Sequence, residues 1–189
     1  MALIVLIVFM ELDRGATRGE PPEGNRAIAS RVSEAKHPQE MALKWRLIDR
    51  ASQRTYALVF ETGDEVIEGL QQFAKQTQAT AADFTGLGAL SDVVVGYFDW
   101  EKKDYQKIPV AEQVEVVSLT GNFALGENDK PALHAHIVVA MSDGHTRGGH
   151  LLKAHVRPTL EVVVTESPTH LRRKHDPESG LALIQVDEA

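Results

Sequence analysis

The sequence contains no cysteine among its 189 residues. Disulfide scaffolds, iron–sulfur centres, cysteine-type zinc fingers and thiol nucleophiles are therefore excluded, and any metal ion must be held by His, Asp or Glu. Positive charge is also scarce, because 20 Lys and Arg residues face 27 Asp and Glu residues, for a net charge of −7. A protein with this charge repels polyphosphates, so DNA binding starts at a disadvantage.

Long hydrophobic runs are missing apart from residues 1–10, which are continuously apolar. As a helix this run would span only about 15 Å, half of the hydrocarbon core of a bilayer, so we expect no membrane span. A secretory signal would begin with positive charge, whereas no Lys or Arg precedes Arg14. We therefore expect a cytoplasmic protein, in which the run is a strand of a sheet or interface, or lies upstream of a true start at Met41.

The composition divides the chain at about residue 40. Residues 11–40 are rich in Gly, Pro and charge without apolar periodicity, so we expect residues 1–40 to be an N-terminal extension that is flexible or a misassigned start. Nothing in it matches the Arg-Gly-Arg-Pro core of an AT-hook, which lies in the minor groove of DNA. Residues 41–189 then form a single domain, and a hydrophobic content of 43% supports a folded core.

The pattern within residues 41–189 predicts an α+β domain. Tyr56–Phe60 is a strand, and Thr62 to Glu65 has the Thr-x-x-Glu spacing of a capping box. Apolar residues then recur at helical spacing, which predicts one main amphipathic helix from about residue 64 to 77. Short β-rich runs divided by Gly, Asp and Pro follow at 92–98, 114–120, 133–141, 155–156, 160–165 and 181–186. We expect a mostly antiparallel sheet or open barrel.

Two further segments are interpreted as structural. Thr85–Leu90 carries two glycines, but it precedes a strand instead of opening a helix. We expect a tight backbone approach or a bulge at a strand end there, and no dinucleotide-binding loop. His170–His175 is a short basic run, which we expect to be a solvated loop rather than a phosphate site.

Histidines concentrate in one stretch of this domain. Four of the eight lie between residues 134 and 150. Residues two apart in a strand share a face, so His134 and His136 project together. Ala135, Ile137 and Val139 then turn to the other side, which we expect to be the core.

A third histidine, His150, follows on the returning strand of a hairpin whose turn is marked by Asp143–Gly144. A three-residue loop would set His150 opposite Val138, on the face of the first two histidines. A two-residue loop would put it on the other face unless Gly148–Gly149 bulges. His145 lies in the turn, and we expect it to be exposed.

Three imidazoles on one face predict a metal site. Neutral imidazoles at about 2.0–2.1 Å from Zn²⁺, with a fourth position left to water or substrate, are typical of a catalytic zinc centre. Such sites also accept other first-row ions. The alternative is that His134 and His136 are merely two half-exposed polar residues on a solvent face, because His-x-His alone is a weak signal.

Separate motifs surround these histidines along residues 55–167. They are Gly63–Val66, Thr85–Asp92, Glu115–Asn122, Leu133–His136, Gly148–Leu151 and Thr159–Val163. In their content and order they resemble the PPC domain, the plant and prokaryote conserved domain, which is found alone in bacteria and archaea and behind AT-hooks in plants.

The resemblance implies an α+β fold with an antiparallel sheet flanked by the helix, assembled as a homotrimer. It also implies that His134, His136 and His150 are the metal ligands. The fold of such domains resembles that of acetolactate decarboxylase, a zinc lyase that uses a His-x-His pair and a later His. Many bacterial members are called DNA-binding because the plant proteins are, but this chain lacks the part that holds the minor groove.

The expected chemistry needs groups beside the metal ion. A bound ion could polarise a carbonyl or lower the pKa of its water towards about 7, and Glu115 or Glu161 could move the proton. Arg147 could hold an anionic substrate. We predict a protein that binds zinc or another first-row divalent ion, and the sequence does not identify its reaction. The reaction class that such a site would suit is that of a lyase or hydrolase acting on a small carbonyl or carboxylate compound. The alternatives are a DNA-binding protein and an oligomeric interaction module.

Overall fold

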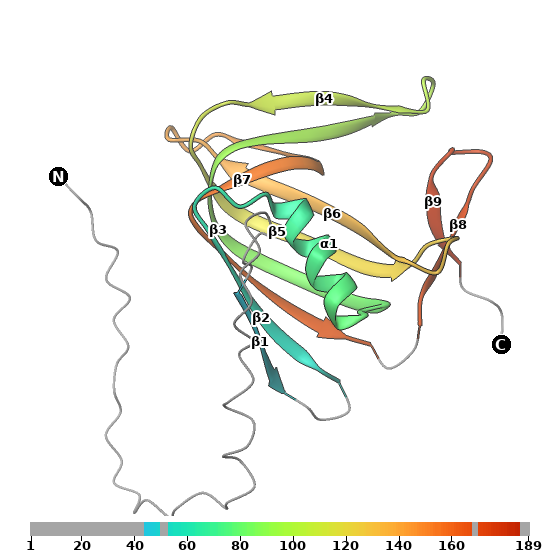
Figure 1. Ribbon diagram of the computed structural model, residues 1–189. Helices are drawn as coiled ribbons and strands as arrows, with labels where there is room; N and C mark the ends of the chain where they lie inside the picture. Colours follow the sequence, from blue (N-terminus) through green and yellow to red (C-terminus); the bar gives the residue numbers. More distant parts are fainter. Residues whose placement is uncertain (1–43, 50–52, 168–169, 186–189) are drawn as a thin grey trace, which may run out of the picture. The chain divides into compact units, whose positions relative to one another are not determined.

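Figure 1 shows the computed structural model, which describes residues 44–49, 53–167 and 170–185. The predicted extension, 1–40, lies outside the described residues. The elements are β1 (Lys44–Asp49), β2 (Thr55–Glu61), α1 (Val66–Thr77), β3 (Ala81–Asp99), β4 (Asp104–Val110), β5 (Val114–Leu125), β6 (Pro131–Ala140), β7 (Thr146–Glu166), β8 (Arg172–His175) and β9 (Ala182–Gln185). The predicted α+β class with one main helix is confirmed. No helix within the described residues is long and apolar enough to cross a membrane.

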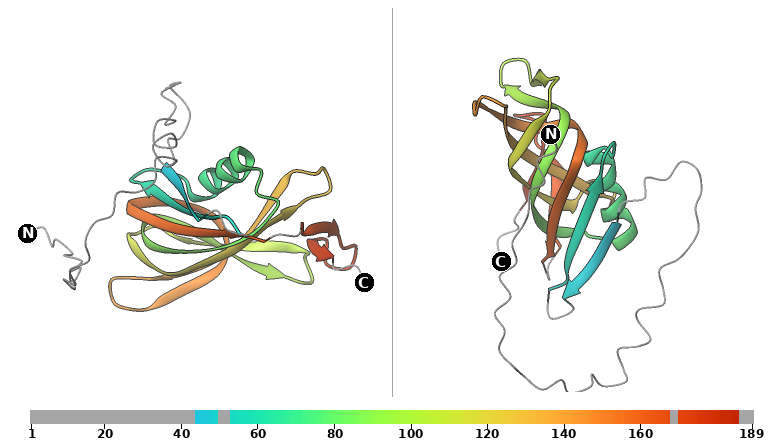
Figure 2. Two further views of the ribbon diagram at one scale, coloured as in Figure 1. Left: turned by 90° about the horizontal axis from the view of Figure 1, so that it is seen from below. Right: turned by 90° about the vertical axis from the view of Figure 1, so that its left-hand side faces the viewer.

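The strands form a single sheet in which all pairings except one are antiparallel. β3 pairs with β5 and β7, and β6 also pairs with β5 and β7, so these strands close a circuit. β2 extends the sheet beyond β7, β4 lies beside the second half of β3, and β8 meets the end of β5 in parallel. Figure 2 shows the curled sheet with α1 across one side. The predicted mostly antiparallel sheet or open barrel is therefore confirmed.

β3 and β7 are longer than the predicted runs, because glycines and bulges let each strand bend without ending. The 19 residues of β3 include Thr85–Leu90, and the pairing with β5 shifts register between Gly86 and Gly88. Gly88 has a φ of +154°, and a Cβ there would clash with the carbonyl oxygen of Thr159 on β7. The predicted close approach and bulge are confirmed, although they lie within a strand and not at its end.

The helix α1 starts at a different cap from the one that the sequence predicts. Glu65 is the N-cap, and its carboxylate accepts hydrogen bonds from the backbone N–H groups of Glu68 at 2.7 Å and Ala154 at 3.0 Å. The hydroxyl of Thr62 instead donates to the carbonyl oxygen of Pro158 at 3.0 Å. The predicted capping box at Thr62 is wrong, because this segment is a turn that is hydrogen-bonded to β7.

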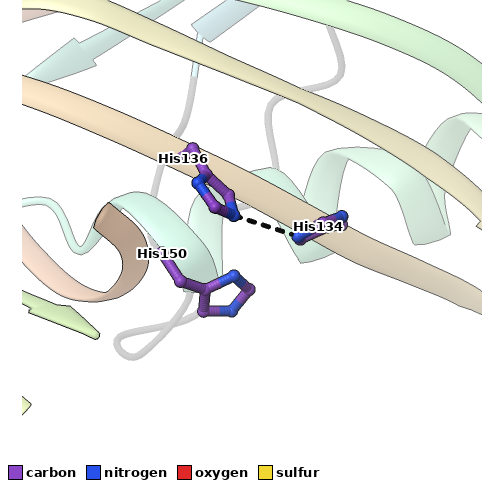
Figure 3. Close-up of side chains that lie close together, drawn as sticks. All are labelled: His134, His136 and His150. Carbon is purple, nitrogen blue, oxygen red and sulfur yellow. Dashed lines mark hydrogen bonds between the residues drawn. The ribbon is translucent and has the colours of Figure 1, made fainter. Parts of the chain in front are cut away.

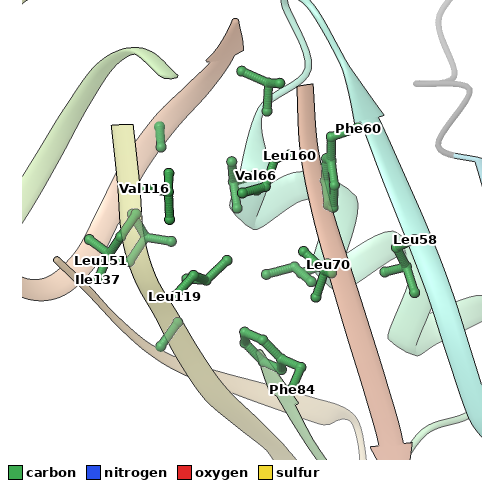
Figure 4. Packing of buried hydrophobic residues seen from close by; sticks show 14 of the residues in the cluster. Leu58, Phe60, Val66, Leu70, Phe84, Val116, Leu119, Ile137, Leu151 and Leu160 are labelled. Atoms are coloured by element: carbon green, nitrogen blue, oxygen red, sulfur yellow. The ribbon is translucent and has the colours of Figure 1, made fainter. Parts of the chain in front are cut away.

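The core lies between α1 and the inner side of the curled sheet (Figure 4). The buried face of α1 includes Leu70 and Phe73, as the helical spacing predicts. Strand residues that are at most 2% exposed complete the core, among them Leu58, Phe60, Phe84, Leu119, Ile137 and Leu160. This packing fixes the orientation of β6 and β7. Each of these strands therefore turns its alternate residues to the outer face, which we define as the side of the sheet away from α1.

Candidate metal centre

β6 alternates between the core and the outer face along its length. Ala135, Ile137 and Val139 are at most 3% exposed and belong to the core. His134 and His136 project from the opposite face, where His136 is exposed and His134 is half-buried. Burial of the apolar residues therefore decides which way the two imidazoles point, as the sequence predicts.

The hairpin between β6 and β7 brings in the third histidine. His150 lies directly opposite His136, and the loop spans residues 141–145. The predicted three-residue loop is therefore wrong, and so is the predicted pairing of His150 with Val138. Because the register differs from the predicted one by an even number of residues, His150 still projects from the same face as the other two histidines.

The three imidazoles converge on one another, as Figure 3 shows. Nε2 of His134 lies 3.2 Å from Nε2 of His136. The ring centroid of His150 lies 5.1 Å from that of His134 and 5.4 Å from that of His136. One ring nitrogen of each residue lies within 4.8 Å of the others. The three side chains thus form a group that could hold one metal ion.

Burial and neighbouring positive charge keep two of these rings neutral. The pKa of His150 is lowered to about 4, first by burial and then by the charges of His134 and His136. The pKa of His134 is also lowered, first by burial and then by the charges of Arg173 and His136. At neutral pH both rings are therefore unprotonated, which is the form that binds a metal ion.

One ring nitrogen of His150 has the surroundings expected of an atom that binds a metal ion. Its Nδ1 is buried and has no hydrogen-bond partner among the described residues. In Figure 3 this nitrogen is on the side of the ring that faces His134 and His136. A buried polar atom without a partner costs about 1–3 kcal/mol, and a bond to an ion would remove that cost. The donor set, three imidazoles, is also one that zinc and related ions accept.

Tyr105 supports the ring of His150. The two rings are stacked, with centroids 4.7 Å apart and an interplanar angle of 23°. Tyr105 belongs to β4 and reaches His150 across Gly96 of β3, where a Cβ would lie 2.7 Å from Cδ1 of Tyr105. Burial raises the pKa of the Tyr105 phenol. The only sign of this contact in the sequence is the glycine within a strand, which indicates a close approach without naming its partner.

Arg173 lies near His134 and lowers its pKa through its charge. Residues 172–175 form β8, and Arg173 is only 7% exposed, so the predicted solvated loop is wrong for this residue. Its Nη2 donates to Oδ1 of Asn122 at 2.6 Å, and Asn122 is directly opposite His134. Burial lowers the pKa of Arg173, but a guanidinium stays charged in proteins. The sequence could not show this contact, because Arg173 and Asn122 are 51 positions apart.

The sheet register does not bring the predicted glutamates to the histidines. Glu115 pairs with Ala140, which is four residues along β6 from His136, or about 13 Å of strand. Glu161 lies on the same strand as His150 but eleven residues away, or roughly 36 Å of strand. Both are exposed. Their predicted role in proton transfer stays a prediction, and their positions do not support it.

Two predicted residues of the β6–β7 hairpin also lie apart from the centre. Arg147 pairs with Val139, three positions from the pair that includes His150, so it projects from the opposite face. Its predicted role in holding a substrate stays a prediction without support from the register. His145 is exposed in the turn, as predicted, and its Nδ1 lies 2.9 Å from a carboxylate oxygen of Asp143.

The fold and the site define a class of small antiparallel β-protein with one main helix and three histidines that could hold a metal ion. Residues 48–168 match the model of the Plants and Prokaryotes Conserved (PCC) domain. The chain therefore belongs to this family, which is also written PPC, and the predicted resemblance is confirmed.

Solved structures share this fold. A protein from Bacteroides thetaiotaomicron, for which DNA binding is given only as a conjecture, is 27% identical with a TM-score of 0.70 and covers 77% of this chain and 98% of its own. A metal-containing protein from Archaeoglobus fulgidus is 30% identical with a TM-score of 0.65 and covers 76% of this chain and 98% of its own. Structures of the acetolactate decarboxylase type also align, but their TM-scores of 0.47 and 0.45 are too low to bear on the chemistry.

A curated relative is much longer than this chain. The bifunctional protein GlmU of Synechococcus sp. (strain JA-3-3Ab) is 28% identical over 141 residues, a match that covers 72% of this chain and 21% of the relative. The chain thus spans about a fifth of the length of the curated relatives that it matches. The similarity concerns one region of those proteins, so their activities are not transferred to this chain.

Proposed function

We propose that this protein binds one divalent first-row metal ion, zinc in the first instance, through His134, His136 and His150. The main support is the convergence of three imidazole nitrogens within 4.8 Å on the outer face of the sheet. Two ligands at about 2.0–2.1 Å from a tetrahedral zinc ion lie about 3.3 Å apart. The Nε2 atoms of His134 and His136 are 3.2 Å apart, which agrees with such a pair. The metal-containing relative from Archaeoglobus fulgidus also supports the proposal.

The proposed function of the bound ion is to act on a small molecule. Three protein ligands leave a coordination position open, and a zinc ion there supplies Lewis-acid polarisation of a carbonyl or a water of lowered pKa. The ring of His136 is exposed, which supports access to the centre from solvent and not through the core. The reaction class that fits is the lysis or hydrolysis of a small carbonyl or carboxylate compound, in the cytoplasm, as predicted from the sequence.

Metal analysis of protein purified without added metal tests this proposal. We expect about one zinc ion per chain in the wild-type protein. His134→Ala and His150→Ala should each abolish stoichiometric zinc, because losing a ligand is more severe than losing an outer-shell partner, which already costs on the order of 10–100-fold in metal affinity.

The matched control is His145→Ala, which removes an exposed histidine from the same hairpin. This variant should keep the zinc content of the wild type, and circular dichroism should show that all the variants are folded. If folded His150→Ala protein kept one zinc ion per chain, or if the wild-type protein stayed empty after incubation with excess zinc, the proposal would be wrong.

We also propose that copies of the chain assemble through the outer face into a homotrimer, the state that the resemblance implies. Exposed hydrophobic residues support this use of the face, because large apolar patches commonly mark contact sites. They are Val59, Leu87, Val117, Val138 and Val163, between 38% and 65% exposed. Sedimentation velocity measures the state directly. A trimer is expected, and a lone monomer at micromolar concentration would contradict the proposal.

Binding of duplex DNA is a second candidate function, because DNA binding is conjectured for the relative from Bacteroides thetaiotaomicron. The net charge of −7 opposes it. Titration of a fluorescent duplex at about 50 mM salt distinguishes the two functions, since phosphate contacts are strongest at low salt. Affinity that falls steeply as salt is raised would favour DNA binding, and a flat titration would remove this candidate.

A further inference from the structure

Arg173 is a buried cation that lacks an ionic partner within the described residues. Its Nη1 donates to the carbonyl oxygen of Ala182 at 3.0 Å, and its Nη2 donates to Oδ1 of Asn122 at 2.6 Å. Nε is buried and has no hydrogen-bond partner there. The ion pairs in the described part of the chain do not include Arg173. A charged side chain that is only 7% exposed is therefore left with hydrogen-bonding capacity and with no counter-charge among residues 44–49, 53–167 and 170–185.

This cation lies beside the three histidines. Asn122 and His134 are directly opposed on β5 and β6, so their side chains share the outer face with Cα atoms about 5 Å apart. The guanidinium that donates to Asn122 therefore lies next to the candidate metal centre. On the other side of Asn122, Asp83 of β3 occupies the same row of the sheet, but it forms no ion pair with Arg173 among the described contacts.

The charges of the centre favour an anionic ligand. Three neutral imidazoles do not offset the charge of a divalent ion, and the guanidinium adds another positive charge close by. A buried charge is costly unless it is paired, and a guanidinium pairs best with a carboxylate that accepts two of its N–H groups. A negatively charged ligand would offset both positive groups at once, which a neutral carbonyl compound would not do.

We propose that Arg173 and Asn122 are the anion-binding half of this site and hold a carboxylate group of a small organic acid whose other end reaches the metal ion. This inference rests on the proposed metal binding and narrows its substrate class to small acids with a second oxygen donor. It also assigns to Arg173 the role that the sequence suggests for Arg147.

A purely structural role for Arg173 is the competing explanation, because its two hydrogen bonds join β9 to β5. The substitution Asn122→Asp separates the two roles. An aspartate there would accept the same hydrogen bond from the guanidinium, so the fold should be retained. Its carboxylate would also neutralise the guanidinium and so replace the carboxylate of the ligand. A structural role predicts a protein that is at least as stable and binds ligands as before.

The experiment uses the full-length protein loaded with Co²⁺, whose visible absorption reports ligands that reach the ion. The probes are succinate and glutarate, each compared with butyrate or valerate, in which a methyl group replaces one carboxylate. We expect the wild-type protein to prefer each diacid over its monoacid by at least tenfold at constant ionic strength. Asn122→Asp and Arg173→Met should both abolish this preference. Arg172→Gln is the matched control on the same strand and should retain it, because Arg172 pairs with Asp129 at 2.7 Å instead.

The outcomes separate this inference from the proposed function. If Co²⁺ binds stoichiometrically but the wild-type protein shows no preference for diacids, or if Asn122→Asp keeps the wild-type preference, the inference is overturned and metal binding stands. If no Co²⁺ binds to the wild-type protein, both are overturned. If Arg173→Met fails to fold, the Asn122→Asp variant decides the question alone.

Discussion

On its inner face β6 presents Ala135, Ile137 and Val139 to the core, and on its outer face it presents His134 and His136. The inner residues are at most 3% exposed and pack with α1 and the neighbouring strands. The outer residues are half-buried or exposed and contact other polar rings. Because successive residues of a strand alternate, a single segment supports both regions, and the core holds the histidines in place without touching them.

The two regions also differ in how well their contacts stabilise the fold. The inner face is made of apolar side chains whose burial is favourable by about 25 cal/mol per Å². The outer face has imidazoles whose pKa values are lowered at His134 and His150. It also has a guanidinium and a buried Nδ1 atom that find no counter-charge and no hydrogen-bond partner, respectively, in the described part of the chain. Groups whose charge or hydrogen-bonding capacity is not satisfied by the fold are expected at functional sites. The difference indicates that the core maintains the fold while the outer face serves binding.

The largest effect that tests this difference is the loss of a core side chain from β6. Ile137→Ala should lower the free energy of unfolding by about 2–5 kcal/mol, because it removes a side chain that is 1% exposed and leaves a cavity. Val138→Ala, one residue away on the outer face and 38% exposed, should cost less than about 1 kcal/mol. Urea denaturation of metal-free protein measures both. Equal losses at the two positions would show that the faces do not differ.

A smaller effect is expected where α1 joins the inner side of the sheet. Glu65→Ala removes the acceptor for two backbone N–H groups, those of Glu68 and Ala154, and should cost about 1–3 kcal/mol. Thr62→Ala, which alters the residue that the sequence marks as the cap, should cost less than about 1 kcal/mol because its hydroxyl is exposed. Thermal unfolding compares the two variants. A larger loss for Thr62→Ala would restore the predicted capping box.

The alternation of β6 explains why much of this architecture could be predicted from the sequence. Apolar residues alternate strictly at positions 135, 137 and 139, which assigns that face of the strand to the core. The histidines at 134 and 136 must then lie on the other face. Of the two loops that the sequence leaves open, the three-residue loop puts His150 on the observed face, although the observed loop has two residues more. Because side chains alternate with a period of two, a register error of two residues leaves each side chain on its predicted face. The face of the site is therefore predicted more reliably than the hairpin that forms it.

What the sequence could not show are contacts between distant segments. Tyr105 reaches His150 from another strand, and Arg173 reaches Asn122 from 51 positions away. Neither residue belongs to a motif whose spacing implies its partner. The predicted cap at Thr62 is wrong for a related reason, because the observed cap, Glu65, also accepts a hydrogen bond from Ala154 on the distant strand β7. Local patterns report local geometry, and tertiary packing decides between equally good local choices.

The histidine face should also make the metal-free protein sensitive to acid. The pKa of His150 is lowered from its ordinary value of 6.5 to about 4, so the folded protein resists a proton that the unfolded chain accepts. Between about pH 6.5 and pH 4 the unfolded state therefore binds more protons, and the free energy of unfolding should fall as the pH is lowered. Allowing for solvent around a half-buried ring, we expect a loss of about 1–2 kcal/mol.

Urea denaturation of metal-free protein at intervals across this range measures the slope. His150→Ala should flatten it, since the variant has no ring whose protonation is opposed by folding. His145→Ala is the control and should keep the wild-type slope, because that histidine is exposed in the turn. The same slope in all three proteins would mean that other groups cause the acid sensitivity.

The smallest expected effect concerns how firmly the outer face holds its rings. Tyr105→Leu removes the ring that stacks on His150 at 4.7 Å, and such aromatic contacts contribute about 0.5–1.5 kcal/mol. Zinc should therefore bind roughly 2–10-fold more weakly while the fold is retained, because leucine still covers Gly96. Tyr97→Leu is the matched control, since Tyr97 is 65% exposed on the same β3–β4 hairpin. Competition with a chromophoric chelator measures both affinities. Equal affinities in the two variants would show that the ligands are held by the strands alone and that Tyr105 belongs to the hairpin and not to the metal centre.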